Sequence, residues 1–178
     1  PATDPGCAGG GLAPTLPLPM GARTTAREAA LQMLYALEAS RDPVDLVVRD
    51  FWAEMPGDAE DRAYADALVR GVAGSLDRVD QLVSKASSNW RLERMTRVDR
   101  NLLRLGAYEL LARPEIPRAV VLDEAVELAK RFGTAESGAF VNGVLDRVAD
   151  DCGRVDDDRE RGATADRRAP PGSAPGAR

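Results

Sequence analysis

Histidine is absent from this 178-residue sequence, and cysteine occurs only twice, as Cys7 and Cys152. The absence of histidine removes the commonest general base and the commonest metal ligand. The two cysteines form no Cys–Cys or Cys–His spacing of the kind that holds zinc. The sequence also has no glycine-rich phosphate loop after a strand and no GxSxG nucleophile motif. We therefore expect no metal site, no cofactor and no catalytic activity.

Aromatic residues are scarce at 4% of the chain, although hydrophobic residues make up 44%. The core must therefore consist mainly of Ala, Leu and Val. Ala and Leu favour helices, whereas strands prefer β-branched and aromatic side chains. No segment alternates in the way a half-buried strand does. This composition predicts an all-α fold.

The sequence contains no run of 18 apolar residues, so we expect no membrane span. Its first residues have neither a basic region nor a continuous apolar region, as a signal peptide would, which predicts a cytoplasmic protein. The formal net charge is −5. An acidic chain is not drawn to nucleic acid by its overall field, so RNA binding would require a local basic patch.

Two segments of unusual composition flank the middle of the chain. Residues 1–19 are rich in Pro, Gly and Ala and carry one charge, and residues 153–178 mix charges with Pro and Gly. Such segments bury too little apolar surface to fold, so we expect both to be disordered. The predicted folded domain is residues 20–152.

Hydrophobic residues within this domain recur at helical spacing, which predicts about seven short helices in a bundle. Thr25 and Glu28 match a capping box at the first helix start. The later predicted starts are Asp42-Pro43, Asp58, Ser75, Thr96, residue 118 and Thr134. Gly133 is expected to end the sixth helix in a left-handed conformation.

Six cations lie between Lys85 and Arg104, against two acids. Arg97, Arg100 and Arg104 share one predicted helix face, where guanidinium groups can bind phosphates bidentately. Internal salt bridges or a solvated arginine face remain the alternatives. Arg23 and Arg27 flank the first helix start, which also suits a phosphate, although ordinary surface arginines explain them as well.

Residues 133–146 form an unusual predicted helix because it contains Gly138 and Gly143. Each glycine costs about 1 kcal/mol relative to alanine, which indicates close approach of another helix or of a ligand. Asn142 can read a base edge. Phe140 can stack on a base if it is exposed, or pack in the core if it is not. In the preceding helix, the acids from Asp123 to Glu127 are expected to form a solvated face.

Several blocks of the sequence resemble the NusB family of transcription antitermination factors. They are TAREAALQMLY at residues 25–35, RVDRNLLRLGAYEL from residue 97, DEAVELAKRFG from residue 123 and FVNGVLD at residues 140–146. The resemblance covers residues 21–150. It implies an all-helical protein of two small subdomains that has no cofactor. It also implies binding to the boxA element of nascent RNA, especially ribosomal RNA leaders, together with the ribosomal protein NusE, to act on RNA polymerase.

Matching positions imply RNA contacts at Arg23, Arg27, Tyr35, Glu136 and Phe140. Asn142 belongs to the matching FVNG motif, with an RNA-contacting or a structural role. One departure is that the family's arginine run before the first helix is thinned to two arginines, which weakens the electrostatic attraction to RNA. We expect Arg91 and Arg94 to compensate by extending the RNA path.

The sequence is also compatible with two other interpretations. NusB-like domains also occur attached to ribosomal RNA cytosine methyltransferases, and the short segment after residue 150 disfavours that arrangement. The second alternative is a helical module that binds other proteins or associates with itself. In the self-associating case, a homodimer would cover the RNA-binding surface.

Overall fold

Seven α-helices and one short 3₁₀ helix make up the computed structural model, which describes residues 20–55, 57–88 and 90–154. They are α1 (Met20–Ser40), α2 (Val44–Glu54), α3 (Ala59–Gly74), α4 (Leu76–Ala86), η1 (Leu92–Arg94), α5 (Arg97–Ala112), α6 (Arg118–Phe132) and α7 (Ser137–Asp151). No strand occurs in these ranges, and no helix in them is long and apolar enough to span a membrane. The all-α prediction is confirmed. The predicted disordered segment 1–19 lies outside the described residues, and so do residues 155–178 of the predicted disordered tail 153–178.

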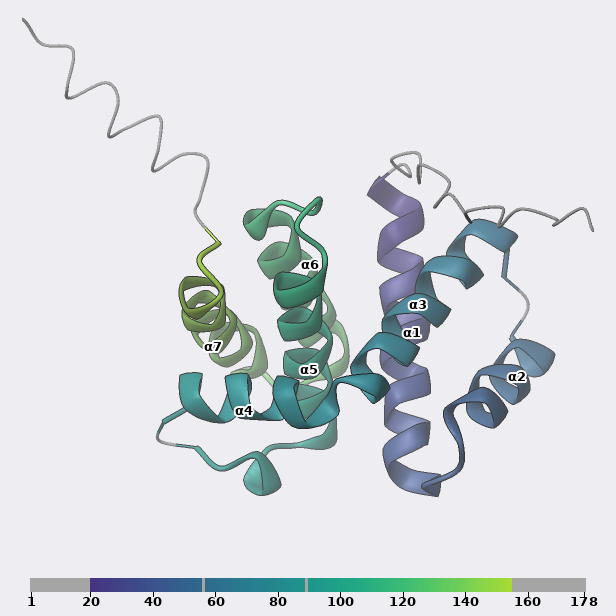
Figure 1. Cartoon of the computed structure of the whole chain (residues 1–178), viewed down its shortest axis with the longest axis horizontal. Coiled ribbons are helices and arrows are strands. Elements are labelled where there is room, and N and C mark those ends of the chain that lie inside the picture. The colour runs from purple at the N-terminus through teal and green to yellow at the C-terminus, as the bar shows by residue number, and fades with distance from the viewer. Residues whose placement is uncertain (1–19, 56, 89, 155–178) are drawn as a thin grey trace, which may run out of the picture.

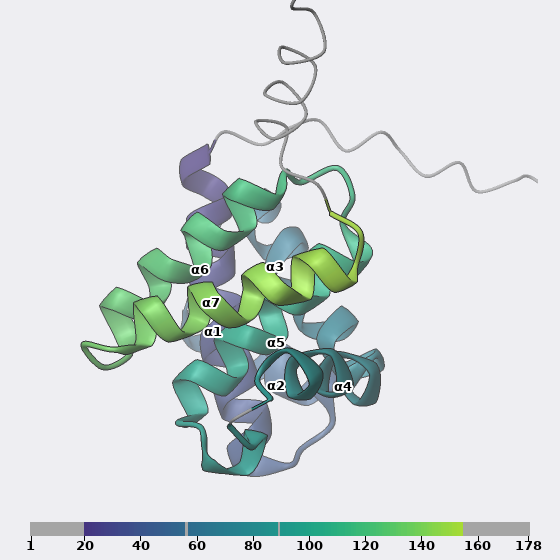
Figure 2. The same ribbon diagram turned by 90° about the vertical axis from the view of Figure 1, so that its left-hand side faces the viewer.

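Helix α5 is the central element of the fold. Figure 1 shows α1, α2 and α3 on one side of it and α4, α6 and α7 on the other. It packs against α1 and α3 as well as against α4, α6 and α7. In the perpendicular view, α7 runs beside α6 and crosses in front of α5 (Figure 2). One continuous apolar core, built mainly of Ala, Leu and Val, runs through both halves.

Two predicted helix starts have the geometry that the sequence indicated. The Asp58 carboxylate accepts a hydrogen bond from the Asp61 backbone N at 3.1 Å, at the start of α3. The Thr96 hydroxyl accepts one from the Asp99 backbone N, also at 3.1 Å, at the start of α5. Both side chains satisfy a backbone donor that the first helical turn leaves free.

The starts predicted at Ser75 and residue 118 are also confirmed, because Ser75 precedes the first residue of α4 and α6 begins at Arg118. The starts predicted for α1 and α2 are wrong. Helix α1 begins at Met20, so Thr25 and Glu28 lie inside the helix and form no capping box. Pro43, not Asp42, precedes the first residue of α2. The Thr24 hydroxyl makes a tertiary contact, because it donates to Glu124 Oε1 of α6 at 2.9 Å.

The connection between α6 and α7 also differs from the prediction. Gly133 is extended, with φ −97° and ψ −159°, rather than left-handed. Glycine is required there by space, since a Cβ would lie 2.5 Å from Ser137 Oγ. Thr134 does not start α7, because Glu136 is the capping residue and the Thr134 backbone N donates to Ser137 Oγ at 2.9 Å.

Candidate nucleic-acid interface

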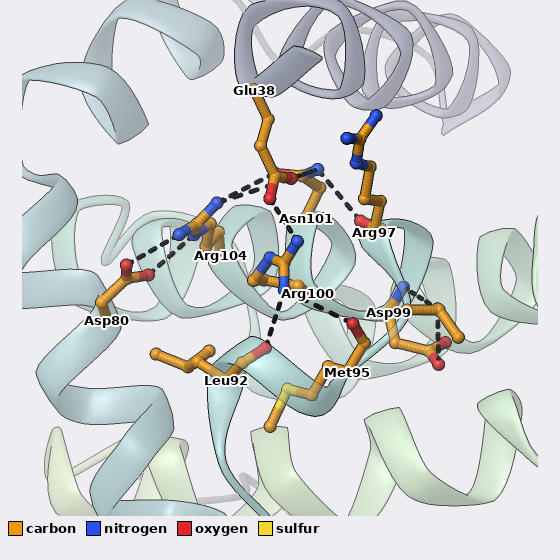
Figure 3. Close-up of polar contacts among 10 residues, drawn as sticks. Glu38, Asp80, Leu92, Met95, Arg97, Asp99, Arg100, Asn101 and Arg104 are labelled. Atoms are coloured by element: carbon orange, nitrogen blue, oxygen red, sulfur yellow. Dashed lines mark hydrogen bonds and ion pairs between the residues drawn. The ribbon is translucent and has the colours of Figure 1, made fainter.

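Most of the arginine row on α5 is engaged inside the fold. Arg104 binds the Asp80 carboxylate of α4 through two hydrogen bonds of 2.7 Å, and Arg100 binds Glu38 of α1 (Figure 3). Asn101 donates to the same Glu38 at 2.8 Å. Burial lowers the pKa of Arg104, but the hydrogen bond and charge of Asp80 outweigh it and raise the pKa. Internal salt bridges therefore explain Arg100 and Arg104.

Arg27 is buried, with 2% of its surface exposed. Its guanidinium binds both oxygens of Glu109 of α5 at 2.8–3.1 Å, and Glu124 lies 3.6 Å away. The Tyr64 hydroxyl of α3 donates to the same Glu109 at 2.7 Å. Arg27 thus joins α1 to α5, and the prediction that it contacts RNA at the surface is wrong. Glu124 also departs from prediction, because it points inward rather than belonging to a solvated face.

The charges of this buried cluster are fixed by their neighbours. Burial lowers the pKa of Arg27, but the charge of Glu109 and its hydrogen bonds outweigh burial and raise the pKa. Burial raises the pKa of Tyr64, and the negative Glu109 raises it further. Arg27 therefore stays charged and Tyr64 stays protonated at neutral pH.

A groove lies between η1 and the start of α7, away from the buried Arg27 cluster, and we call it the Trp90 groove. Its volume is about 320 Å³. The groove is lined by Trp90, Arg94, Met95, Thr96, Asp99, Thr134, Glu136, Ser137 and Phe140. Trp90 is 55% exposed, and its ring centroid lies 6.3 Å from that of the half-buried Phe140. Phe140 therefore packs against the core and also lines the groove.

Exposed charges border this groove. Arg91 and Arg94 are exposed, and neither forms a side-chain hydrogen bond or ion pair with the described residues. Glu136 is exposed, and its Oε2 accepts from the Thr134 hydroxyl at 3.1 Å. The groove thus combines free guanidinium groups with accessible aromatic rings, the pairing that binds single-stranded nucleic acid.

Tyr35 lies beside the same end of α5. Tyr35 is 43% exposed, and the guanidinium of the exposed Arg97 lies 5.7 Å from the centroid of its ring. Arg97 follows Thr96, which lines the Trp90 groove. The start of α5 therefore connects this tyrosine–arginine pair to the groove.

Two predicted site residues lie elsewhere. Arg23 is half-buried over the Tyr64 ring, 5.8 Å from its centroid, near the first turn of α1. Figures 1 and 2 show that end of α1 at the opposite side of the molecule from the short teal η1. Asn142 is exposed, but it lies about 200° around α7 from Phe140 and so points away from the groove.

The two glycines of α7 are not explained by a close helix. A Cβ at Gly143 would meet nothing within 4 Å, and one at Gly138 would make an ordinary contact of 3.5 Å with Lys130. Trp90, which lines the groove, is not among the site residues predicted from the sequence. The available signal was a tryptophan in a polar turn, directly before two closely spaced arginines, in a chain that has few aromatic residues.

Comparison with known proteins gives a consistent result. The model of the NusB family matches residues 24–150. The transcription antitermination protein NusB of Sorangium cellulosum (strain So ce56) is 69% identical over 140 residues, which are 79% of this chain and all of that protein. NusB of Myxococcus xanthus (strain DK1622) is 51% identical and aligns over 73% of this chain and 96% of its own length.

Solved structures agree with the sequence comparisons. A crystal form of T. maritima NusB superposes with a TM-score of 0.68 at 40% identity, covering 72% of this chain and 90% of that one. The NusB chain in a crystal structure of the antitermination factors NusB and NusE with dsRNA gives a TM-score of 0.69 at 26% identity. That match covers 74% of this chain and 98% of the other.

Proposed function

The chain belongs to the NusB family, and we propose that it is a transcription antitermination factor. It binds boxA-type nascent RNA, chiefly leaders of ribosomal RNA operons, together with NusE, and thereby alters elongation and termination by RNA polymerase. One observation carries this proposal: the sequence matches an antitermination protein over that protein's entire length at 69% identity. A structure of a related NusB with NusE and dsRNA supports both partners.

The proposed RNA path follows the exposed side chains around the start of α5. Arg91 and Arg94 are available to bind phosphates, because no described carboxylate engages them. Phe140 and Tyr35 offer ring surface on which unpaired bases stack, an interaction worth about 1–3 kcal/mol per base. Paired bases are already stacked within a duplex, so this surface favours single strands.

The remaining predicted contacts have smaller parts in the proposal. Glu136, at the rim of the Trp90 groove, accepts hydrogen bonds from base amino groups. Asn142 and Arg23 lie off the main path, and we propose that they contact flanking nucleotides or NusE. Arg27 has no place in the interface, because Glu109 binds it in the interior.

The family role supports a binding protein rather than an enzyme. A factor that binds nascent transcripts acts where transcription occurs, so we propose a cytoplasmic location. The proposal requires neither a cofactor nor a membrane.

Binding measurements test the proposal directly. The purified chain is titrated into a labelled boxA RNA, a scrambled RNA of the same composition and a boxA duplex, with and without NusE, at two salt concentrations. We expect the tightest binding to single-stranded boxA, tighter still with NusE, and weaker at the higher salt because phosphate contacts release counterions.

Equal and weak binding to all three RNAs, unchanged by NusE, would contradict the proposal. Light scattering at two protein concentrations, with and without RNA, then measures the molar mass. A dimer that persists in the presence of RNA would identify the self-associating form whose RNA-binding surface is covered. A preference for the duplex would reject the single-strand mode and retain RNA binding.

A further inference from the structure

A second pocket lies among α1, α2 and the start of α3, and we call it the Asp61 pocket. Its volume is about 130 Å³, and Figure 1 shows these three helices on the side of α5 away from α4, α6 and α7. None of the residues of the Trp90 groove or of the proposed RNA path lines it. The pocket is lined by Thr25, Glu28, Ala29, Gln32, Phe51, Trp52, Met55, Gly57 and Asp61.

Asp61 gives this pocket a charge that the fold leaves without a partner. The residue is 7% exposed, and its Oδ1 is buried and accepts no hydrogen bond from the described residues. Burial raises the pKa of Asp61, and the neighbouring charges of Asp58 and Glu60 raise it further. A buried carboxylate without a partner costs free energy, so a cation that enters the pocket is bound favourably.

The nearest arginine does not supply that cation. Arg62 Nη2 donates to the Trp52 carbonyl at 2.9 Å, and the Arg62 guanidinium lies 5.0 Å from the centroid of the Trp52 ring. Glu28, the other acid of the pocket, is paired with Arg131 of α6. Asp61 is thus the lining carboxylate whose charge the described residues leave uncompensated.

The apolar lining of the pocket suits the stem of a long cationic side chain. The ring centroids of Phe51 and Trp52 lie 4.9 Å apart, with planes inclined by 81°. Met55 is 52% exposed and adds apolar surface. Gly57 lies close against the tryptophan, since a Cβ there would be 3.0 Å from Trp52 Cζ3. Lysine and arginine pack their methylene groups on such surfaces and bind aromatic rings through their charge.

The surface around the pocket is negative. Residues 41–70, which include α2 and most of α3, contain eight acids and four arginines. Glu54, Asp58 and Glu60, which are near the lining residues in sequence, are exposed. Negative charge repels a phosphate backbone, and no group of acids, cysteines or histidines among the described residues is arranged to hold a metal ion. Charge complementarity therefore favours a basic protein segment over nucleic acid or metal.

We propose that the Asp61 pocket is a docking site for an arginine or lysine side chain on a basic segment of a partner protein. The cationic group binds the Asp61 carboxylate, and its methylene groups pack on Phe51, Trp52 and Met55. The exposed acids around the pocket attract further basic residues of the same segment. This inference goes beyond RNA binding, because it gives the chain a second contact surface at residues that the proposed RNA path does not use.

Nuclear magnetic resonance of the full chain tests this docking site. The chain has two tryptophans, so its indole N–H region contains one signal from Trp52 in the pocket and one from Trp90, which Trp90→Phe assigns. The probe is a short glycine–serine peptide, acetylated and amidated, that carries three arginines. The control peptide has citrulline, an uncharged analogue of arginine, in their place. We expect the arginine peptide alone to shift the Trp52 signal saturably, while the Trp90 signal stays in place.

Asp61→Asn removes the charge of the pocket and keeps its shape. This variant is expected to bind the arginine peptide about tenfold more weakly, because a charge-assisted hydrogen bond is lost. Asp50→Asn is the matched control, since it removes an equal charge from α2 at an exposed residue that pairs with Arg49 and does not line the pocket. The control is expected to change the affinity by no more than about twofold.

Urea denaturation distinguishes a docking role of Asp61 from a structural one. Because the charge is buried without a partner, Asp61→Asn should leave the equilibrium constant for unfolding unchanged or should lower it. An increase of more than about tenfold would exceed what a carboxylate in the first helical turn gains from the helix dipole. Such an increase would show that Asp61 stabilises the fold, and it would overturn the docking site.

Three binding results would also overturn it: equal shifts with both peptides, an unchanged affinity in Asp61→Asn, or an equal loss in Asp50→Asn. The last result would mean that net charge alone attracts the peptide. Asp61→Asn is expected to bind boxA RNA as the wild-type chain does. Failure of the wild-type chain to bind boxA RNA therefore defeats the proposed function, whereas failure of the arginine peptide to shift Trp52 defeats only this inference.

Discussion

Arginine has opposite roles at the two ends of α1. Near the start of the helix, Arg27 is buried and bound to Glu109, a residue 82 positions away in the sequence. Near its end, beside η1, Arg91 and Arg94 are exposed and have no carboxylate partner among the described residues. The same side chain thus holds the fold together in one region and is available to a ligand in the other. The difference depends on whether tertiary structure supplies a carboxylate.

The two settings also differ in energy. A buried charge is costly to leave unpaired, since the interior screens it poorly, whereas an exposed guanidinium is solvated by water. Replacement of a buried arginine should therefore affect stability, and replacement of an exposed one should affect binding. The predictions below test this contrast.

The largest expected effect is on stability. Arg27→Met leaves Glu109 buried without its cation, which should lower the free energy of unfolding by about 3–5 kcal/mol. Arg91→Met should change it by no more than about 0.5 kcal/mol. Urea denaturation measures both. Arg27→Met combined with Glu109→Leu should recover much of the loss, and a double variant no more stable than Arg27→Met would contradict the buried-pair account.

The next effect is on RNA binding. Arg91→Ala with Arg94→Ala removes two proposed phosphate contacts, so the slope of log affinity against log salt should become shallower by about 1.4. Fluorescence anisotropy at several salt concentrations measures this slope. The control replaces Arg49 and Arg70, exposed arginines that pair with Asp50 and Asp45. If the control variant changes the salt slope equally, net charge alone explains the effect, and the positions of Arg91 and Arg94 do not matter.

An intermediate case lies between the two extremes. Arg104 is partly buried and binds Asp80, while Glu38 lies 3.8 Å away as a second carboxylate. Asp80→Asn should therefore cost only about 1 kcal/mol of stability, because Glu38 still compensates the charge. Thermal unfolding at neutral pH measures this value. A loss as large as that of Arg27→Met would show that Glu38 gives no compensation.

The smallest effect is a pH dependence in the buried cluster. Burial, together with Glu109, raises the pKa of Tyr64 above its ordinary value of 10.0. The unfolded chain therefore loses this proton first, so the contribution to stability is complete below pH 10 and declines as the pH rises beyond it. Tyr64→Phe should lose stability less steeply than the wild type above pH 10, as followed by urea denaturation. Parallel curves would exclude Tyr64 as the source.

Local sequence signals predicted much of the fold. The spacing of apolar residues gave seven helices, and Asp58 and Thr96 cap the helices that they were expected to cap. Such signals succeed because a helix needs only residues within one or two turns to form. They failed at the start of α1, where Thr24 binds Glu124 from a distant helix.

The sequence by itself determined that the chain is helical, rich in Ala and Leu, and supplied with arginines near residues 23–27 and 85–104. Only the tertiary structure decided which arginines face solvent and placed Trp90 beside Phe140. It also left one oxygen of Asp99 without a donor among the described residues. The reason is that a charge takes its environment from neighbours in space, and helices that are distant along the chain supply most of those neighbours.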